Sequence, residues 1–201
     1  MLGLIGKIIY DYPERGFYEQ LFSEGVFREM PLELDNDDFR IGRALLCTYC
    51  ESPLDLGSLE SDYTQLFILG KPATSLWQSA FVSPEHMLFQ PSTLKSREWY
   101  KKYDLQLKRL YTEPDDHVGL MLIFAGFLAD KAVKTEDPDV LNDFENFCSE
   151  QILSWAPQWC DQVVLAARTD FYKGLALLAK GVLKSLWGIH PLPKGQACPS
   201  H

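Results

Sequence analysis

The stretch YTEPDDHVGLMLIFAGFLAD, Tyr111 to Asp130, places two aspartates and a histidine directly before twelve residues that carry no charge, Val118 to Ala129. Twelve residues are too few to cross a bilayer, which takes about 20 apolar residues in a helix. Acids flank the run on both sides, so we interpret it as a helix buried in the core of a globular protein. The three polar residues in front of it are the first candidates for a functional site.

The 201-residue chain is long enough to bury one sizeable core. Its hydrophobic fraction of 46% and charged fraction of 23% are those of an ordinary globular protein. We expect one helical domain over residues 1–190. A flexible tail is expected over 191–201, where Pro191 and Pro193 prevent the last helix from continuing.

Acids outnumber bases, with 28 Asp and Glu against 19 Lys and Arg, and the formal net charge is −9. This charge repels nucleic acid and anionic membranes and attracts a basic partner. No segment is apolar enough to span a membrane, and the N-terminus lacks the basic start and the cleavage site of a signal peptide. The five cysteines form no disulfide-scaffold pattern, so we expect a cytoplasmic protein that inserts into no membrane.

Helix start and stop signals recur along the chain, whereas no sustained run alternates apolar and polar residues as a strand would. Asp35 or Asn36 is the predicted cap of a helix that Pro53 ends, and Ser58 is the predicted cap of the next one. Further helices are predicted over 83–89, 91–107, Asp137 to Glu150, and Asp170 to about Gly188. The sequence therefore predicts an all-α bundle of about eight to ten helices.

Familiar catalytic and metal-binding motifs are missing. Cys47 and Cys50 have the spacing of a zinc or thiol-exchange pair, but no second pair stands at a matching distance, so we expect both to pack as small apolar side chains. The segment GKPAT (70–74) lacks the earlier glycine and the hydroxyl residue of a phosphate loop. The zinc-protease motif, the inward Glu-x-x-His pair of a di-iron bundle and the nucleophile elbow of hydrolases are also absent.

The Asp115-Asp116-His117 cluster has two interpretations. In an enzyme, one carboxylate would orient His117 as a general base. In a structural role, Thr112 and Asp115 stand in capping-box spacing, and acids in a first helical turn stabilise it by about 0.3 to 1 kcal/mol each. The residues alone favour the structural role, and a small hydrolase that uses Asp116 and His117 stays an open alternative.

Six short segments follow one another along nearly the whole chain: IGKIIYDYPE (5–14), YTQLFILG (63–70), SLWQSAFVSPEHMLF (75–89), EPDDH (113–117), ILSWAPQW (152–159) and FYKGLALLAKGVL (171–183). In this order and spacing they resemble the TorD/DmsD family of redox-enzyme maturation chaperones, most closely its DmsD branch. The resemblance implies an all-helical chaperone that is not an enzyme. The sequence departs from the family pattern at Ser75-Leu76, where relatives have two prolines, and at Phe81, where Trp or Tyr is usual.

The resemblance also implies a function in Tat proofreading. Such a chaperone binds the twin-arginine signal peptide of a molybdopterin oxidoreductase of the dimethyl sulfoxide reductase type and delays export until the cofactor is inserted. The implied partners are that leader peptide, the catalytic subunit that carries it, and Tat translocase components. Some members are implied to bind guanine nucleotide or the molybdenum cofactor, so a carrier protein is a further alternative, although no residue here indicates either ligand.

Ten residues are implied to bind the peptide by their position in the family motifs: Tyr63, Leu66, Phe67, Leu76, Trp77, Ser79, Phe81, Glu113, Asp116 and His117. A signal peptide has a basic end and an apolar middle, so its receptor needs an apolar groove with carboxylates near one end. Glu113 and Asp116 are expected at the mouth of this groove, where a carboxylate can pair with arginine through two hydrogen bonds. The alternative for the aromatic and aliphatic members is ordinary core packing, because stripes at helical spacing usually face the interior.

Overall fold

The computed structural model of the protein describes residues 1–69, 74–105 and 114–189. These residues form ten α-helices and no strand longer than one isolated bridge, which confirms the all-α prediction. The predicted tail, 191–201, lies outside the described residues. The helices are α1 (Leu2–Tyr10), α2 (Arg15–Ser23), α3 (Asp37–Glu51), α4 (Leu56–Tyr63), α5 (Gln78–Val82), α6 (Pro91–Lys102), α7 (Val118–Thr135), α8 (Pro138–Phe147), α9 (Ala156–Ala166) and α10 (Asp170–Ile189), with π-helical turns at Thr64–Ile68 and Cys148–Leu153.

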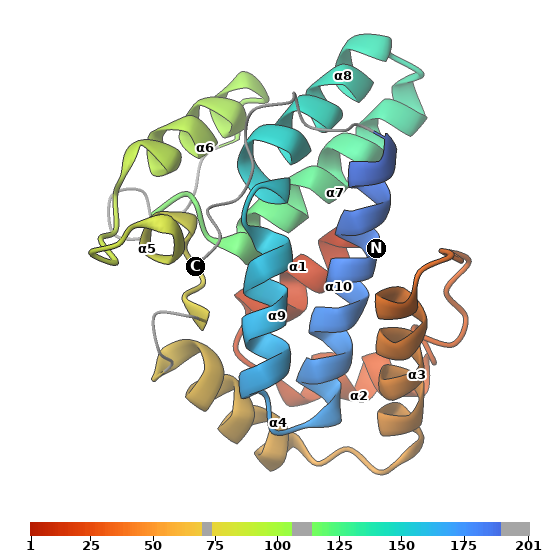
Figure 1. Ribbon diagram of the computed structural model, residues 1–201. Helices are drawn as coiled ribbons and strands as arrows, with labels where there is room; N and C mark the ends of the chain where they lie inside the picture. The colour runs from red at the N-terminus through yellow and green to blue at the C-terminus, as the bar shows by residue number, and fades with distance from the viewer. Residues whose placement is uncertain (70–73, 106–113, 190–201) are drawn as a thin grey trace.

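Helix α10 lies at the centre of the bundle, between α3 on one side and α9 on the other (Figure 1). Glycines allow α3 and α10 to approach backbone to backbone. A Cβ atom on Gly181 would lie 2.5 Å from the amide nitrogen of Phe39, and one on Gly174 would lie 3.0 Å from the carbonyl oxygen of Gly42. Larger side chains at these positions would force the two helices apart.

The twelve-residue uncharged run forms most of α7, which packs against α1 and α8. Glycines again mark the crossing: a Cβ atom on Gly6 would lie 2.5 Å from the carbonyl oxygen of Gly119, and one on Gly126 would lie 2.7 Å from the amide nitrogen of Gly3. Most of the apolar side chains of α7 are buried, which confirms the prediction of a core helix. Over the described ranges, no helix is both long and apolar enough to cross a bilayer.

Two distant parts of the chain meet at the start of α10. The fully buried ring of Phe171 lies 5.5 Å from the ring of Tyr18 and 5.8 Å from that of Tyr49, so α2, α3 and α10 share one aromatic core.

Asp62 of α4 accepts hydrogen bonds from the amides of Arg168 and Thr169 at 3.1 and 2.7 Å. This carboxylate therefore satisfies amides at the start of α10 from another helix.

Two predicted helix starts are confirmed. The Asn36 side chain accepts from the Phe39 amide at 2.9 Å to begin α3, and Asp137 accepts from the Asp139 amide at 2.9 Å to begin α8. The prediction of Ser58 as the cap of α4 is wrong, because Asp55 is the cap. Asp55 accepts from the Ser58 amide at 3.1 Å and from the Ser58 hydroxyl at 2.6 Å, so Ser58 lies inside the first turn.

The helix predicted over 83–89 is wrong. The short helix α5 ends at Val82, and the following segment turns instead, with the His86 amide bonded to the Ser83 carbonyl at 3.0 Å. His86 and Phe89 have positive φ values of 52° and 57°, which no α-helix contains. The predicted helix over 91–107 exists, but it ends at Lys102.

Candidate functional site

The candidate site is built where the start of α7 meets α5 and α6. Trp77 and His117 form the isolated antiparallel bridge. On its two sides the Gln78 amide donates to the Asp116 carbonyl at 3.0 Å, and the Val118 amide donates to the Leu76 carbonyl at 2.7 Å. The segments SLWQSAF and EPDDH, which the sequence analysis grouped by resemblance alone, are therefore in direct contact.

Asp116 is fully buried, and both of its carboxylate oxygens accept hydrogen bonds from within the protein. One oxygen accepts from the Ser79 amide at 2.7 Å and the Ser92 hydroxyl at 3.0 Å, and the other accepts from the Thr93 hydroxyl at 3.0 Å. The side chain joins α5, α6 and the start of α7. This structure therefore gives Asp116 an anchoring role, and its pairing with a peptide arginine stays a prediction.

His117 is the N-cap of α7, since its Nδ1 accepts from the Gly119 amide at 3.0 Å. Its ring lies edge-on between the rings of Tyr10 and Trp77, at centroid distances of 5.1 and 5.5 Å. Only 2% of the residue is exposed, and burial lowers its pKa to about 3, so the imidazole is neutral. The predicted cap formed by Thr112 and Asp115 is wrong because α7 begins later, at Val118; Thr112 itself lies outside the described residues.

Asp115 forms an ion pair with Arg97 that no sequence motif predicts. The Nε and Nη2 atoms of Arg97 donate to its Oδ2 at 3.0 and 2.6 Å, and the Tyr100 hydroxyl donates to its backbone carbonyl at 3.0 Å. A sequence signal for this contact exists in α6, where Thr93, Ser96, Arg97 and Tyr100 recur at helical spacing and form a polar stripe that faces the interior.

The predicted apolar peptide-binding residues divide into two groups. Tyr63, Leu66, Phe67 and Leu76 are buried in the main core, where the Phe67 ring stacks 6.1 Å from that of Trp159. Trp77 and Phe81 are half-buried, and Phe81 lies 5.5 Å from the Trp155 ring. Glu113 lies outside the described residues. The structure thus brings Trp77, Ser79, Asp116 and His117 together and leaves the first group in the interior.

The segment from the end of α5 to the first turn of α6 displays apolar side chains that no sequence motif marked as a surface. Val82, Met87, Leu88, Phe89 and Leu94 are all exposed. Two contacts hold the turn in this segment: His86 Nδ1 lies 2.9 Å from the Ala80 carbonyl oxygen, and the Ser83 hydroxyl donates to Glu85 at 3.2 Å. Apolar groups gathered on a surface mark interaction sites more often than isolated ones do.

Four buried side-chain polar atoms in the described chain have no hydrogen-bond partner. Three belong to consecutive residues at the candidate site, namely Trp77 Nε1, Gln78 Oε1 and Ser79 Oγ, and the fourth is Nε1 of Trp159, the residue stacked on Phe67. Each such atom costs about 1 to 3 kcal/mol of stability relative to a bonded one. Three of the four atoms therefore lie at one junction, where α5 meets the start of α7.

The cysteine pair behaves as predicted. Cys47 and Cys50 are free thiols on α3 that pack half-buried against the core, and burial raises the pKa of Cys50 to about 12. A thiol with so high a pKa is a poor nucleophile. Across the part of the chain that the structure describes, no three His, Cys, Asp or Glu side chains gather as a metal site would require.

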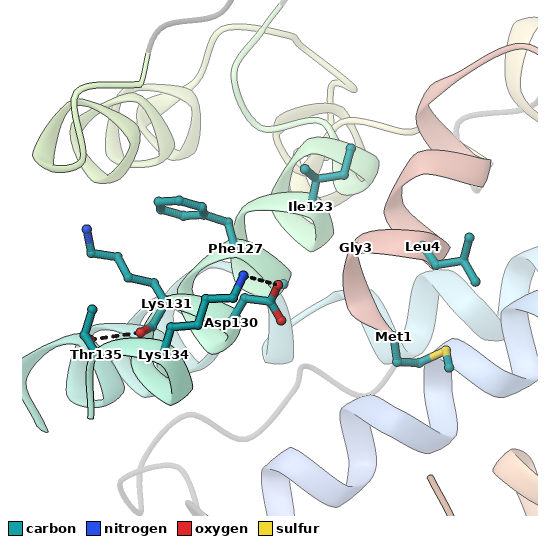
Figure 2. A pocket seen from close by; sticks show the side chains of 10 residues that line it. Met1, Gly3, Leu4, Ile123, Phe127, Asp130, Lys131, Lys134 and Thr135 are labelled. Carbon is teal, nitrogen blue, oxygen red and sulfur yellow. Dashed lines mark hydrogen bonds and ion pairs between the residues drawn. The ribbon is translucent and has the colours of Figure 1, made fainter. Parts of the chain in front are cut away.

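An open cavity of about 660 Å³ lies between the start of α1 and the part of α7 from Ile123 onward (Figure 2). Leu4 and Ile123 supply apolar lining, and the Lys134–Asp130 pair at 3.6 Å lies at its edge. None of the predicted peptide-binding residues that the structure describes lines this cavity. It is separate from the candidate site.

Comparison with known proteins places the chain in a family. The model of the nitrate reductase delta subunit family matches residues 35–161. The chain is 32% identical over 122 residues to a Haemophilus influenzae protein named probable Tat proofreading chaperone DmsD, an alignment that covers 60% of this chain and only 56% of that protein. It is 30% identical over 185 residues to Tat proofreading chaperone DmsD of Salmonella typhi, covering 88% of this chain and 82% of that one.

A solved structure supports the fold. The crystal structure described as a redox enzyme maturation protein from Archaeoglobus fulgidus superposes with a TM-score of 0.55 at 20% identity, covering 92% of this chain and 94% of that one. The family model matches more than half of this chain, and the Salmonella protein aligns with most of it. The chain therefore belongs to the nitrate reductase delta subunit family, the family of the DmsD and TorD chaperones.

Proposed function

We propose that the protein is a cytoplasmic maturation chaperone for a molybdopterin oxidoreductase of the dimethyl sulfoxide reductase type. It binds the twin-arginine signal peptide of the catalytic subunit and delays export through the Tat translocase until the cofactor is inserted. The observation that carries the proposal is the alignment with a Tat proofreading chaperone over 88% of the chain. Its relatives are named as chaperones and not as enzymes.

The chemistry around the α5–α7 junction fits such a ligand. The net charge of −9 attracts the basic end of a leader peptide and makes the encounter faster at low salt. Beside the junction, half-buried Trp77 and Phe81 and the exposed side chains of Met87 and Phe89 offer apolar surface for the middle of the leader. The unpartnered atoms of residues 77–79 add polar partners for its main chain.

The geometry argues against the hydrolase alternative. A general base needs an accessible lone pair on a side chain whose pKa lies near the working pH. In His117 the Nδ1 lone pair is used by the Gly119 amide, the ring is buried, and its pKa is about 3. Both carboxylate oxygens of Asp116 are used by internal donors.

The test is calorimetric titration of the protein with the synthetic leader of a dimethyl sulfoxide reductase-type catalytic subunit from the same genome. We expect saturable binding that weakens as salt is raised and falls at least tenfold when both leader arginines are replaced by lysine. A leader that does not bind, or that binds equally well with lysines, would refute the proposal.

A surface variant locates the contact without disturbing the anchors. Met87→Ser removes an apolar side chain that is 55% exposed, and Leu165→Ser does the same on α9 at 80% exposed. We expect Met87→Ser to weaken leader binding severalfold and Leu165→Ser to leave it unchanged. Equal effects of the two substitutions would contradict a site at the α5–α6 loop.

A further inference from the structure

We propose that Asp115 is the carboxylate that recognises a leader arginine, and that Arg97 occupies its place in the unliganded chaperone. This inference rests on the proposed function, because it assigns a role within the same leader-binding site. Asp115 is not among the ten residues implied by the family motifs. Its role is inferred from the Arg97–Asp115 ion pair and from the unpartnered side-chain atoms of Gln78 and Ser79.

The Arg97–Asp115 pair has the geometry of a bound arginine ligand. The guanidinium donates twice to one oxygen, from Nε at 3.0 Å and from Nη2 at 2.6 Å. The Asp115 side chain is 2% exposed, whereas that of Arg97 is 15% exposed. The carboxylate is thus fixed in the interior, and the guanidinium lies on its outer side.

Asp115 can exchange its partner, and Asp116 cannot do so without local unfolding. The partners of Asp116 include the amide of Ser79, a main-chain group that holds α5 in place. The Asp115 carboxylate bonds to one side chain, and within the described chain its Oδ1 accepts no hydrogen bond. Exchanging one guanidinium for another keeps the buried charge paired, so the cost of an isolated buried carboxylate does not arise.

The same geometry selects arginine over lysine. A guanidinium presents Nε–H and Nη–H in a planar fork that reproduces both bonds made by Arg97, whereas an ammonium cannot reproduce this fork. Each guanidinium carries five N–H donors, of which the Asp115 contact uses two.

The unpartnered polar atoms give an independent indication of a ligand at this junction. Gln78 Oε1 is an acceptor, and Ser79 Oγ can accept as well. Their backbone amides bond to Asp116, the residue next to Asp115. An arginine-containing peptide supplies side-chain and main-chain N–H donors for both atoms.

The test measures binding of the twin-arginine leader and its twin-lysine version to Arg97→Gln. Removing the resident guanidinium should raise affinity for the twin-arginine leader roughly tenfold, equivalent to about 1.4 kcal/mol, and leave the twin-lysine affinity nearly unchanged. Lys102→Gln is the matched control, since Lys102 is a cation on the same helix that pairs with Asp143 at 2.6 Å. Lys102→Gln should change the affinities for the twin-arginine and twin-lysine leaders by the same small factor.

Further measurements test the same inference if Arg97→Gln does not fold. Arg97→Lys keeps the charge and loses the fork, so it should raise twin-arginine affinity by a smaller factor. In the wild type, NMR should detect the Arg97 Nε–H signal as protected from exchange, and the protection should disappear when the twin-arginine leader binds. Adding Asp115→Asn to Arg97→Gln should abolish the preference for arginine over lysine.

Failure of this inference is distinguishable from failure of the proposed function. If the wild type binds the leader with an arginine preference, but Arg97→Gln and Lys102→Gln shift affinity alike and Arg97 Nε–H stays protected, the exchange is overturned and the chaperone function stands. If the wild type does not bind the leader, both are overturned.

Discussion

The buried imidazole of His117 makes the free energy of unfolding decrease as the pH is lowered. Its pKa in the folded protein is about 3, against 6.5 for an unperturbed histidine, and burial is the cause. The folded pKa is the lower one, so between these values the unfolded chain binds the extra proton. The contribution of neutral His117 to the free energy of unfolding is therefore fully present above about pH 6.5, and it is lost as the pH decreases toward 3.

From pH 7.5 to pH 5 the unfolded histidine gains nearly one proton, and linkage gives a loss of about 2 kcal/mol in the free energy of unfolding. His117→Asn removes the titrating group and retains a side-chain oxygen that can cap α7. Urea denaturation of both proteins at the two pH values isolates this term, since all other titrating groups are common to both. We expect the wild type to lose about 2 kcal/mol more than the variant. Equal losses would refute the reasoning and mean that His117 is protonated or accessible in the folded state.

Three further predictions concern stability and are measured by urea denaturation at pH 7.5. Asp116→Ala should lower the free energy of unfolding by about 3 to 5 kcal/mol, because three internal donors lose a buried charged acceptor. The control Asp130→Ala, at an exposed position, should change this free energy by no more than about 0.5 kcal/mol. Similar losses in the two variants would contradict the anchoring role of Asp116. Gly6→Ala should cost about 1 to 3 kcal/mol because its Cβ meets the α7 backbone. Gly3→Ala on the same helix has open space and should be neutral or slightly stabilising; a reversed order would mean that the α1–α7 crossing is looser than the structure has it. Asp62→Ala should cost about 2 kcal/mol because the Arg168 and Thr169 amides, directly before α10, lose their acceptor. An unchanged urea midpoint would refute that contact.

The sequence predicted those helices whose starts depend on residues close in the chain. Asn36 and Asp137 each bond to an amide two or three residues later, so the local pattern contains the whole interaction. The failure at 83–89 has the opposite origin. Ser83 and Pro84 look like a helix start, but Ser83 bonds within a turn, and the helix of this region lies earlier, where Ser79 is bonded to Asp116.

The sequence predicts which segments form the candidate site, but it does not predict which of their side chains are buried. The family motifs contain Trp77, Ser79, Asp116 and His117, and the structure brings these four together through the Trp77–His117 bridge and the bond from the Ser79 amide to the Asp116 carboxylate; their role in peptide binding stays a prediction. Nothing in the local sequence distinguishes a carboxylate at a groove mouth from one enclosed by three donors, because those donors come from two other helices. Arg97 was missed for the same reason: its partner is 18 positions away in sequence.

The glycine contacts described for α1 with α7 and α3 with α10 also bear on how the chain folds during synthesis. Each joins a helix of the first quarter of the protein to one made much later. Residue 170 follows the end of α3 by more than a hundred positions, which at about 5 to 20 residues per second takes on the order of ten seconds. The apolar face of α1 has no native partner until α7 is made, and that of α3 has none until α10 is made, at the end of this interval. A newly made copy of this chaperone is thus itself open to aggregation until its last helix leaves the ribosome.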